Sequence, residues 1–222
     1  MTIAEPFTPK IRPHFMGERR VVIHNLTWAA YRQIQEAIGE QRSIRLLFDQ
    51  GTLEIIMPLE EHETARERIS LFIRNWVIFM GLKLKTMGST TLDREDLNRG
   101  VEPDNAFYIQ NQSQVAKRIV DLTKDPPPDL VLEVDITHTD IDKNRLYATL
   151  GVPEFWRYNG ETLIIYQLRG DSYQEVVVSP TFPLMQKEDL YQFLKQCKED
   201  EVNAEMSLRH QIQSQIIKNT SS

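Results

Sequence analysis

The sequence predicts an α+β protein that is built around a mixed β-sheet. Helix-like and strand-like segments follow one another without the regular βαβ alternation of a doubly wound fold. The apolar run at 130–132 is typical of a central strand that is buried on both faces. Asn159-Gly160, which lies between two apolar segments, is a strong hairpin signal. The length of 222 residues suits one domain with an appendage. We expect an irregular N-terminal arm at 1–20, a single domain at 21–197 and a helical tail at 198–222.

The first half of the chain predicts a helix, a hairpin and a second, longer helix. Thr27 stands where an N-cap belongs, and apolar residues then recur at helical spacing until Gly39. The turn signal at 49–51 joins two short apolar segments into a hairpin. An apolar stripe from Ala65 to Met80, in steps of three and four, predicts a long amphipathic helix. The segments expected here are the helix that Thr27 caps, strands at 44–48 and 53–57, a helix at 60–80, a strand at 82–87, a turn at 88–91 and a charged loop at 93–99.

The second half is richer in strands. A strand is expected at 105–109, and three prolines give the strand at 129–136 a stiff, extended entry. Leu146 and Leu150 have the spacing of a helix that Gly151 ends. The other segments expected here are a helix at 140–150, strands at 154–158, 162–168 and 173–178, and a helical region from about 188 in which Leu208, Ile212 and Ile216 form one stripe.

The composition excludes several classes of protein. The formal net charge of -6 means that overall charge does not attract nucleic acid, so a polyanionic substrate would need a local basic face or bound cations. The single cysteine, Cys197, excludes an intramolecular disulfide. The N-terminus lacks the apolar core of a signal peptide, and the apolar stretch at 69–84 is too short and too interrupted to span a bilayer. We therefore expect a cytoplasmic protein with no membrane partner, and the absence of a phosphate-binding glycine motif predicts no nucleotide cofactor.

Acidic side chains interrupt the apolar strands, and this feature points to chemistry. Asp104 precedes the strand at 105–109, and Glu133 and Asp135 lie within the strand at 129–136. Because side chains alternate along a strand, Glu133 and Asp135 point to the same face. Burying an unpaired carboxylate is expensive, so a cation must meet these side chains. The sequence leaves three candidates for it: a metal ion, Lys143 or an arginine. Simple pairing without a functional role stays the alternative for each acid taken singly.

The same acids belong to an ordered set of motifs. The set comprises Glu102-Pro103-Asp104, the run Asp129-Leu-Val-Leu-Glu133-Val-Asp135 after two prolines, Asp142-Lys143, Tyr147-Ala148, Gly151-Val152-Pro153-Glu154 and Trp156, with Leu-Glu-Ile-Ile-Met-Pro58, His62-Glu63 and 88–91 upstream. From about 26 to 194 the chain resembles the Uma family of restriction-endonuclease-like proteins, which is assigned to the PD-(D/E)XK nuclease superfamily.

This resemblance implies a fold and a site. The fold is a restriction-endonuclease-like mixed β-sheet core flanked by helices, with an N-terminal helix plus hairpin and a C-terminal helical tail. In the site, Asp104 and Glu133 are the two acids that bind Mg²⁺ or Mn²⁺, and both count as catalytic residues. The lysine position of the motif falls on Asp135, which departs from the pattern. Lys143, on the following helix, is expected to take the place of that lysine as the third catalytic residue.

Three auxiliary residues are also expected. Glu63 matches the helix-borne acid that some relatives add, Asp135 lies beside the second metal ligand, and His138 follows the acidic strand and could donate to a phosphate or a carboxylate. A turn histidine without a role stays the alternative for His138. His62, at the start of a helix, is expected to be structural.

The function that the resemblance implies is Mg²⁺-dependent hydrolysis of DNA phosphodiester bonds by an endonuclease, with DNA as the partner. Mg²⁺ prefers a few carboxylate oxygens plus waters, so two or three acids suffice for such a site. The alternative is a catalytically impaired nuclease-fold protein that acts as a binding module, or as a self-associating module through the stripe of Leu208, Ile212 and Ile216. A homodimer is expected and is compatible with each of these hypotheses.

Overall fold

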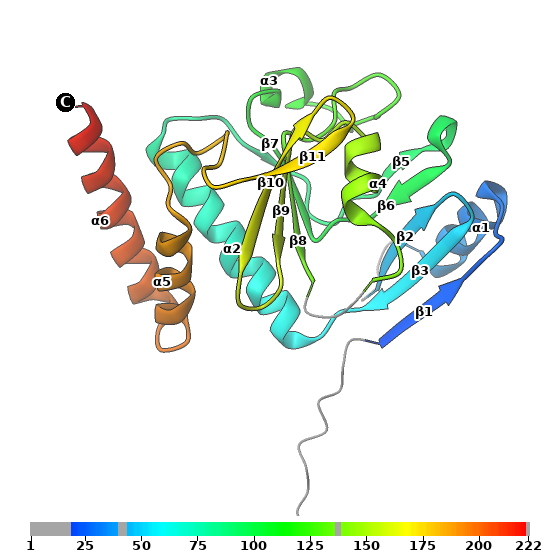
Figure 1. Cartoon of the computed structure of the whole chain (residues 1–222), viewed down its shortest axis with the longest axis horizontal. Coiled ribbons are helices and arrows are strands. Elements are labelled where there is room, and N and C mark those ends of the chain that lie inside the picture. The colour runs from blue at the N-terminus through cyan, green and yellow to red at the C-terminus, as the bar shows by residue number, and fades with distance from the viewer. Residues whose placement is uncertain (1–18, 40–43, 136–138, 221–222) are drawn as a thin grey trace, which may run out of the picture.

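The structure of the chain is a computed structural model that describes residues 19–39, 44–135 and 139–220. These residues form two β-sheets with helices packed around them (Figure 1). The strands are β1 (Arg19–Ile23), β2 (Arg45–Asp49), β3 (Thr52–Met57), β4 (Lys85–Thr86), β5 (Leu92–Arg94), β6 (Arg99–Val101), β7 (Asn105–Tyr108), β8 (Leu130–Val134), β9 (Glu154–Tyr158), β10 (Leu163–Arg169) and β11 (Ser172–Val176). The helices are α1 (Trp28–Ile38), α2 (Glu60–Phe79), α3 (Gln112–Val115), α4 (Lys143–Thr149), α5 (Lys187–Cys197) and α6 (Glu201–Thr220), with a short 3₁₀ turn at Glu95–Leu97. The expected α+β class is confirmed.

The first sheet, called sheet A here, is antiparallel and has the strand order β1-β3-β2-β6-β5. Its central hairpin turns at Gln50 and Gly51, which both have positive φ (47° and 94°), as a two-residue hairpin turn requires. Helix α1 packs on this sheet, where the rings of Tyr31 and Phe48 stack with centroids 4.7 Å apart. The expected N-cap is confirmed, because the hydroxyl of Thr27 accepts a hydrogen bond from the Ala30 amide at 3.1 Å.

The second sheet, sheet B, is mixed and has the order β11-β10-β9-β8-β7-β4. Strands β8 and β9 are parallel and are joined through α4, whereas the other pairs are antiparallel. All five residues of β8 are buried, in agreement with the central strand that the apolar run predicts.

Sheet B divides the core into two layers. Leu130 and Leu132 of β8 face the layer that contains α2, α5 and α6, whereas Val131 faces the layer between the sheets, where α4 lies (Figure 1). Leu208 and Ile212 of α6 belong to the first layer and are buried there. The C-terminal stripe that the self-association hypothesis invoked therefore packs against the rest of the same chain.

Some elements differ from those that the sequence predicts. The expected charged loop at 93–99 contains β5, the 3₁₀ turn and the start of β6, which together form a hairpin at the edge of sheet A. Of the expected strand at 82–87, only the two residues of β4 form a strand. The expected helical region from 188 consists of two helices, α5 and α6, which are separated by residues 198–200. Strand β1 begins at Arg19, inside the expected arm, while residues 1–18 lie outside the described residues.

In the described ranges, none of the helices combines the length and the hydropathy that crossing a membrane would require.

Candidate active site

Two acidic side chains, Asp104 directly before β7 and Glu133 in the neighbouring strand β8, lie on the side of sheet B that faces α4. The antiparallel register pairs Asn105 of β7 with Leu132 of β8, so Asp104 lies one residue before this pair and Glu133 one residue after it. Asp104 is held against β8 by the amide of Val134, which donates to its Oδ2 at 2.6 Å. Both carboxylates are buried, and they line the same cavity.

Helix α4 brings two donors to Glu133. Lys143 and Tyr147 are one turn apart, so their side chains share a face of the helix. The ammonium of Lys143 lies 2.7 Å from Glu133 Oε2 and 2.5 Å from Asp135 Oδ1, and the hydroxyl of Tyr147 donates to Glu133 Oε1. Helix α4 begins at Lys143 because the carboxylate of Asp142 caps it. Lys143 therefore bridges two acids of the same strand end.

The start of α2 and the start of β2 supply the partners of Asp104. His62 Nε2 lies 3.1 Å from Asp104 Oδ2, and Arg45 Nε lies 3.2 Å from Asp104 Oδ1. Arg45 also reaches Glu63, with Nη2 at 2.7 Å from Oε1, and Glu63 accepts a second ion pair from Arg66. Glu63 is thus linked to Asp104 through Arg45.

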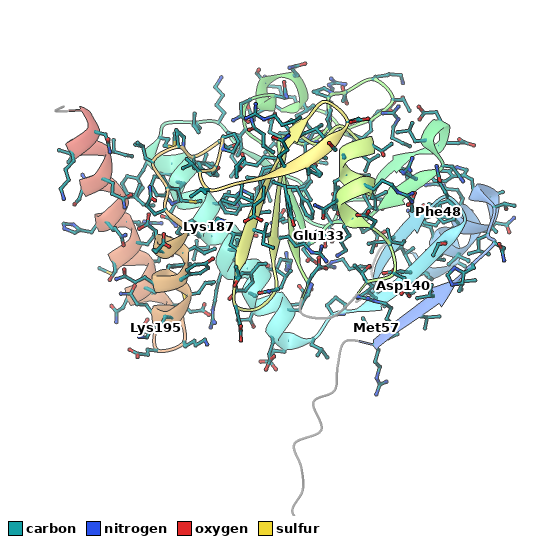
Figure 2. All side chains as sticks on the ribbon, viewed as in Figure 1. Phe48, Met57, Glu133, Asp140, Lys187 and Lys195 are labelled. Atoms are coloured by element: carbon teal, nitrogen blue, oxygen red, sulfur yellow. The ribbon has the colours of Figure 1, made fainter. Side chains whose placement is uncertain are left out.

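Of the other two auxiliary residues, Asp135 is brought into the site and His138 lies outside the described residues. Asp135 accepts from Lys143 on one oxygen and from Arg157 Nε on the other, at 2.7 Å. Figure 2 shows Glu133 near the middle of the molecule, between the helical layer on the side of Lys195 and the part of sheet A that carries Met57. The cavity is lined by Leu47 and Ile56 of sheet A and by Glu133 of sheet B, so the site lies between the two sheets.

The ionisation of these side chains follows from burial and from their neighbours. Burial would raise the pKa of the Asp104 carboxyl, but the hydrogen bond from His62 and the nearby Lys143 ammonium hold that pKa well below its usual range. Burial raises the pKa of Glu133 to about 8 against the attraction of Lys143. For Lys143, burial alone would lower the pKa, but the surrounding carboxylates raise it well above its usual range. At neutral pH Asp104 is therefore ionised and Lys143 is protonated, whereas Glu133 takes up a proton more readily than an exposed carboxylate does.

The cavity between these side chains is small. Its volume is about 10 Å³, close to the minimum that one water molecule needs. Among the described residues, no cluster of three or more His, Cys, Asp or Glu is arranged to hold a metal ion. Asp104 and Glu133 nevertheless supply hard carboxylate oxygens, and Mg²⁺ is commonly held by one or two carboxylates plus waters. The donor chemistry therefore fits a divalent ion, provided that Glu133 exchanges the Lys143 ammonium for that ion.

Several contacts of this site were missed from the sequence, among them those of His62, Tyr147, Arg45 and Arg157. His62 continues the apolar stripe of α2, three residues before Ala65, and this position is the signal that the histidine would be buried. Tyr147 follows Lys143 at the helical spacing of four, which indicates a shared face. Arg45 gave no such signal, because a cation at the start of a short strand usually faces solvent.

Comparison with known proteins supports a nuclease-like fold. The sequence profile of the Uma2 family, described as "Putative restriction endonuclease", matches residues 28–195. A crystal structure of a putative nuclease belonging to DUF820 from Anabaena variabilis superposes with a TM-score of 0.51 at 15% sequence identity, over 75% of this chain and 97% of that chain. At this identity the likeness concerns the fold alone. The comparison with curated proteins returned no match.

Proposed function

The chain belongs to the Uma2 family of restriction-endonuclease-like proteins, and we propose that it is a Mg²⁺-dependent endonuclease that hydrolyses DNA phosphodiester bonds. One observation carries the proposal: Asp104, directly before β7, and Glu133, in the neighbouring strand β8, line one cavity together with Lys143. Paired acids can hold a divalent ion, and a lysine can stabilise the charge that develops on the phosphate during hydrolysis of a phosphodiester. The description of the matching family as a putative restriction endonuclease supports the same activity.

The side chains of this chain have distinct roles in the proposal. Asp104 and Glu133 would hold the divalent ion, which supplies an electrophile for the phosphate and lowers the pKa of an attacking water. Asp104 is ionised and fixed by the Val134 amide, so it is oriented before any substrate arrives. Lys143 keeps its proton and therefore cannot act as a base, but its charge can offset the negative charge that develops on the phosphate.

The experiment is nicking of supercoiled plasmid DNA by the full chain in the presence of Mg²⁺. We expect nicking by the wild-type chain, loss of nicking in EDTA, and a rate lower by a factor on the order of 10² or more in Asp104→Asn and Glu133→Gln. Glu175→Gln, on an exposed position of β11, is the control that should keep the wild-type rate. Nicking that persists in EDTA and in Glu133→Gln would refute the proposal.

A second candidate is a nuclease-fold module that binds DNA without cleaving it. It is favoured by the ion pairs of the site, because Lys143 already bridges Glu133 and Asp135 and an acid stands where the motif has its lysine. Retained binding of a fluorescent DNA duplex, with no nicking in either Mg²⁺ or Mn²⁺, is the result that this candidate predicts.

A further inference from the structure

Glu54, in the middle of β3, is a fully buried carboxylate whose partners lie on the segment that precedes α4. Its oxygens accept hydrogen bonds from the Thr139 hydroxyl at 2.9 and 3.1 Å, from the Asp140 amide at 2.7 Å and from the Ile141 amide at 2.6 Å. Arg20 Nε lies 3.7 Å away. A side chain from sheet A thus binds three consecutive residues of the connection between β8 and α4.

The hydrogen bonds to Glu54 are strong because their acceptor is a carboxylate. A carboxylate that is shielded from water depends on such donors, because an unsatisfied charge in the interior is costly. Hydrogen bonds to an ionised acceptor are shorter and about twice as strong as neutral ones. Ile141 is itself buried in the core layer between the sheets, so apolar packing adds to the same restraint. Residues 139–141 are therefore held by hydrogen bonds to Glu54 and by the apolar packing of Ile141.

The segment that Glu54 holds leads directly to the catalytic lysine of the proposed function. Asp142 caps α4, and Lys143 is the first residue of that helix, two residues after Ile141. A second acid of the same hairpin, Asp49, accepts an ion pair from Arg145 of α4 at 2.6 Å. The β2–β3 hairpin therefore holds the start of α4 through two carboxylates.

We propose that Glu54 is a positioning residue: by fixing residues 139–141 it sets where the Lys143 ammonium lies relative to Glu133 and Asp135. The catalytic part of this inference rests on the proposed function. Lys143 makes contacts of 2.7 and 2.5 Å, and a displacement of about 1 Å in such a site can lower a rate by a factor of about 10². Glu54 acts through Lys143 and touches no substrate.

The matched pair of variants is Glu54→Gln and Glu154→Gln. Glu154, on β9, is likewise a buried strand carboxylate; it accepts from the Ser179 hydroxyl and the Thr181 amide, so it holds a different loop. In Glu54→Gln one carboxylate oxygen becomes an NH2 group that cannot accept a hydrogen bond, and the remaining carbonyl oxygen is a neutral and weaker acceptor, so the segment before α4 is held less firmly. If the glutamine variant does not fold, Glu54→Asp, which keeps the charge but shortens the side chain, takes its place.

The first readout is the position of Lys143, and it does not depend on nuclease activity. Reductive methylation of the full chain, resolved for each lysine by mass spectrometry, should leave the buried Lys143 protected in the wild type and in Glu154→Gln. In Glu54→Gln its modification should rise by a factor of about 10 or more, because the local structure opens more often. Equal protection of Lys143 in both variants would overturn the inference.

The second readout is a double-mutant cycle on plasmid nicking. Glu54→Gln should lower kcat by a factor of about 10 to 10² with little change in KM, and it should have no further effect in a Lys143→Met background. If Glu54→Gln lowered kcat by the same factor in the wild-type chain and in Lys143→Met, Glu54 would act independently of Lys143. The positioning role would then be wrong. A wild-type chain that does not nick DNA would refute the proposed function, whereas the methylation result would still decide whether Glu54 positions Lys143.

Discussion

The ammonium of Lys143, which comes from α4, forms ion pairs with Glu133 and Asp135. The resemblance places the lysine of its motif at Asp135, so this ammonium comes from a different element than the motif implies. The sequence predicted that Glu133 and Asp135 point to the same face, because the alternation of side chains along a strand is a local property. It could not predict that Tyr147 and His62 complete the site, since their contacts depend on how α4 and α2 pack against sheet B. Whether Lys143 is catalytic stays a prediction.

The raised pKa of Glu133 predicts a pH dependence of stability in the metal-free chain. The carboxyl titrates at an ordinary value of 4.5 when the chain is unfolded and at about 8 in the folded protein. Between these values the folded state binds the extra proton, so the free energy of unfolding falls as the pH rises, by at most about 1.4 kcal/mol per pH unit. Glu133→Gln removes this contribution. Urea unfolding in EDTA between pH 5 and pH 8, at about half-unit steps, should show the wild type losing stability relative to the variant. If the difference in the free energy of unfolding between the wild type and Glu133→Gln were the same at every pH, the prediction would be wrong.

At the scale of elements, the hairpin of β5 and β6 shows where prediction from sequence reaches its limit. The segment at 93–99 carries enough charged residues to resemble a loop, but Arg99 is buried in the sheet and paired with Asp49 at 2.9 Å. That partner lies 50 positions earlier in the chain, so no local pattern reveals it. The hairpin of β2 and β3, in contrast, was correctly predicted, because its turn residues and its apolar strands are local signals.

Gly100 of β6 offers a test of this hairpin. A Cβ atom at this position would lie 2.6 Å from the Tyr31 hydroxyl and would also clash with the carboxylate of Asp93. These two groups are hydrogen-bonded to each other at 2.9 Å, which joins α1 to β5. We therefore expect Gly100→Ala to lower the free energy of unfolding by about 1 to 3 kcal/mol.

Chemical denaturation of the variant measures this effect, and Gly170→Ala is a reference for a glycine without neighbours. Gly170 also has a positive φ (64°), so its variant carries backbone strain but no steric contact. If Gly100→Ala lowered the free energy of unfolding by no more than about 0.5 kcal/mol, the hairpin of β5 and β6 would not pack closely against α1.

At the scale of the whole molecule, the chain is layered as helices, sheet B, α4 and sheet A, and the candidate site lies in the layer between the sheets. The sequence predicted the strands of one mixed sheet but not their division into two sheets. Pairing between strands that are far apart in the chain decides this division, as the pairing of β2 with β6 illustrates. The sequence also predicted the C-terminal stripe, but not that its residues pack against α2 and α5.

Helix α6 provides the test at this scale. Leu208 is buried in the core, whereas Met206, on the same helix, is 65% exposed. Leu208→Ala should lower the free energy of unfolding by about 2 to 5 kcal/mol, because it leaves a cavity in the core. Met206→Ala should change it by less than about 0.5 kcal/mol. Urea unfolding gives both values, and analytical ultracentrifugation follows the oligomeric state. A Leu208→Ala chain that keeps its stability but changes its oligomeric state would instead support the stripe as a self-association surface.

The most direct test of the proposed metal site is anomalous X-ray diffraction from crystals of the full chain soaked in Mn²⁺. We expect an anomalous peak between the carboxylates of Asp104 and Glu133, with the Lys143 ammonium displaced from Glu133, and no peak in crystals of Asp104→Ala soaked in the same way. If the wild-type crystals show Mn²⁺ only elsewhere, or none, while Lys143 keeps its contact with Glu133, then these two carboxylates do not form a divalent-ion site.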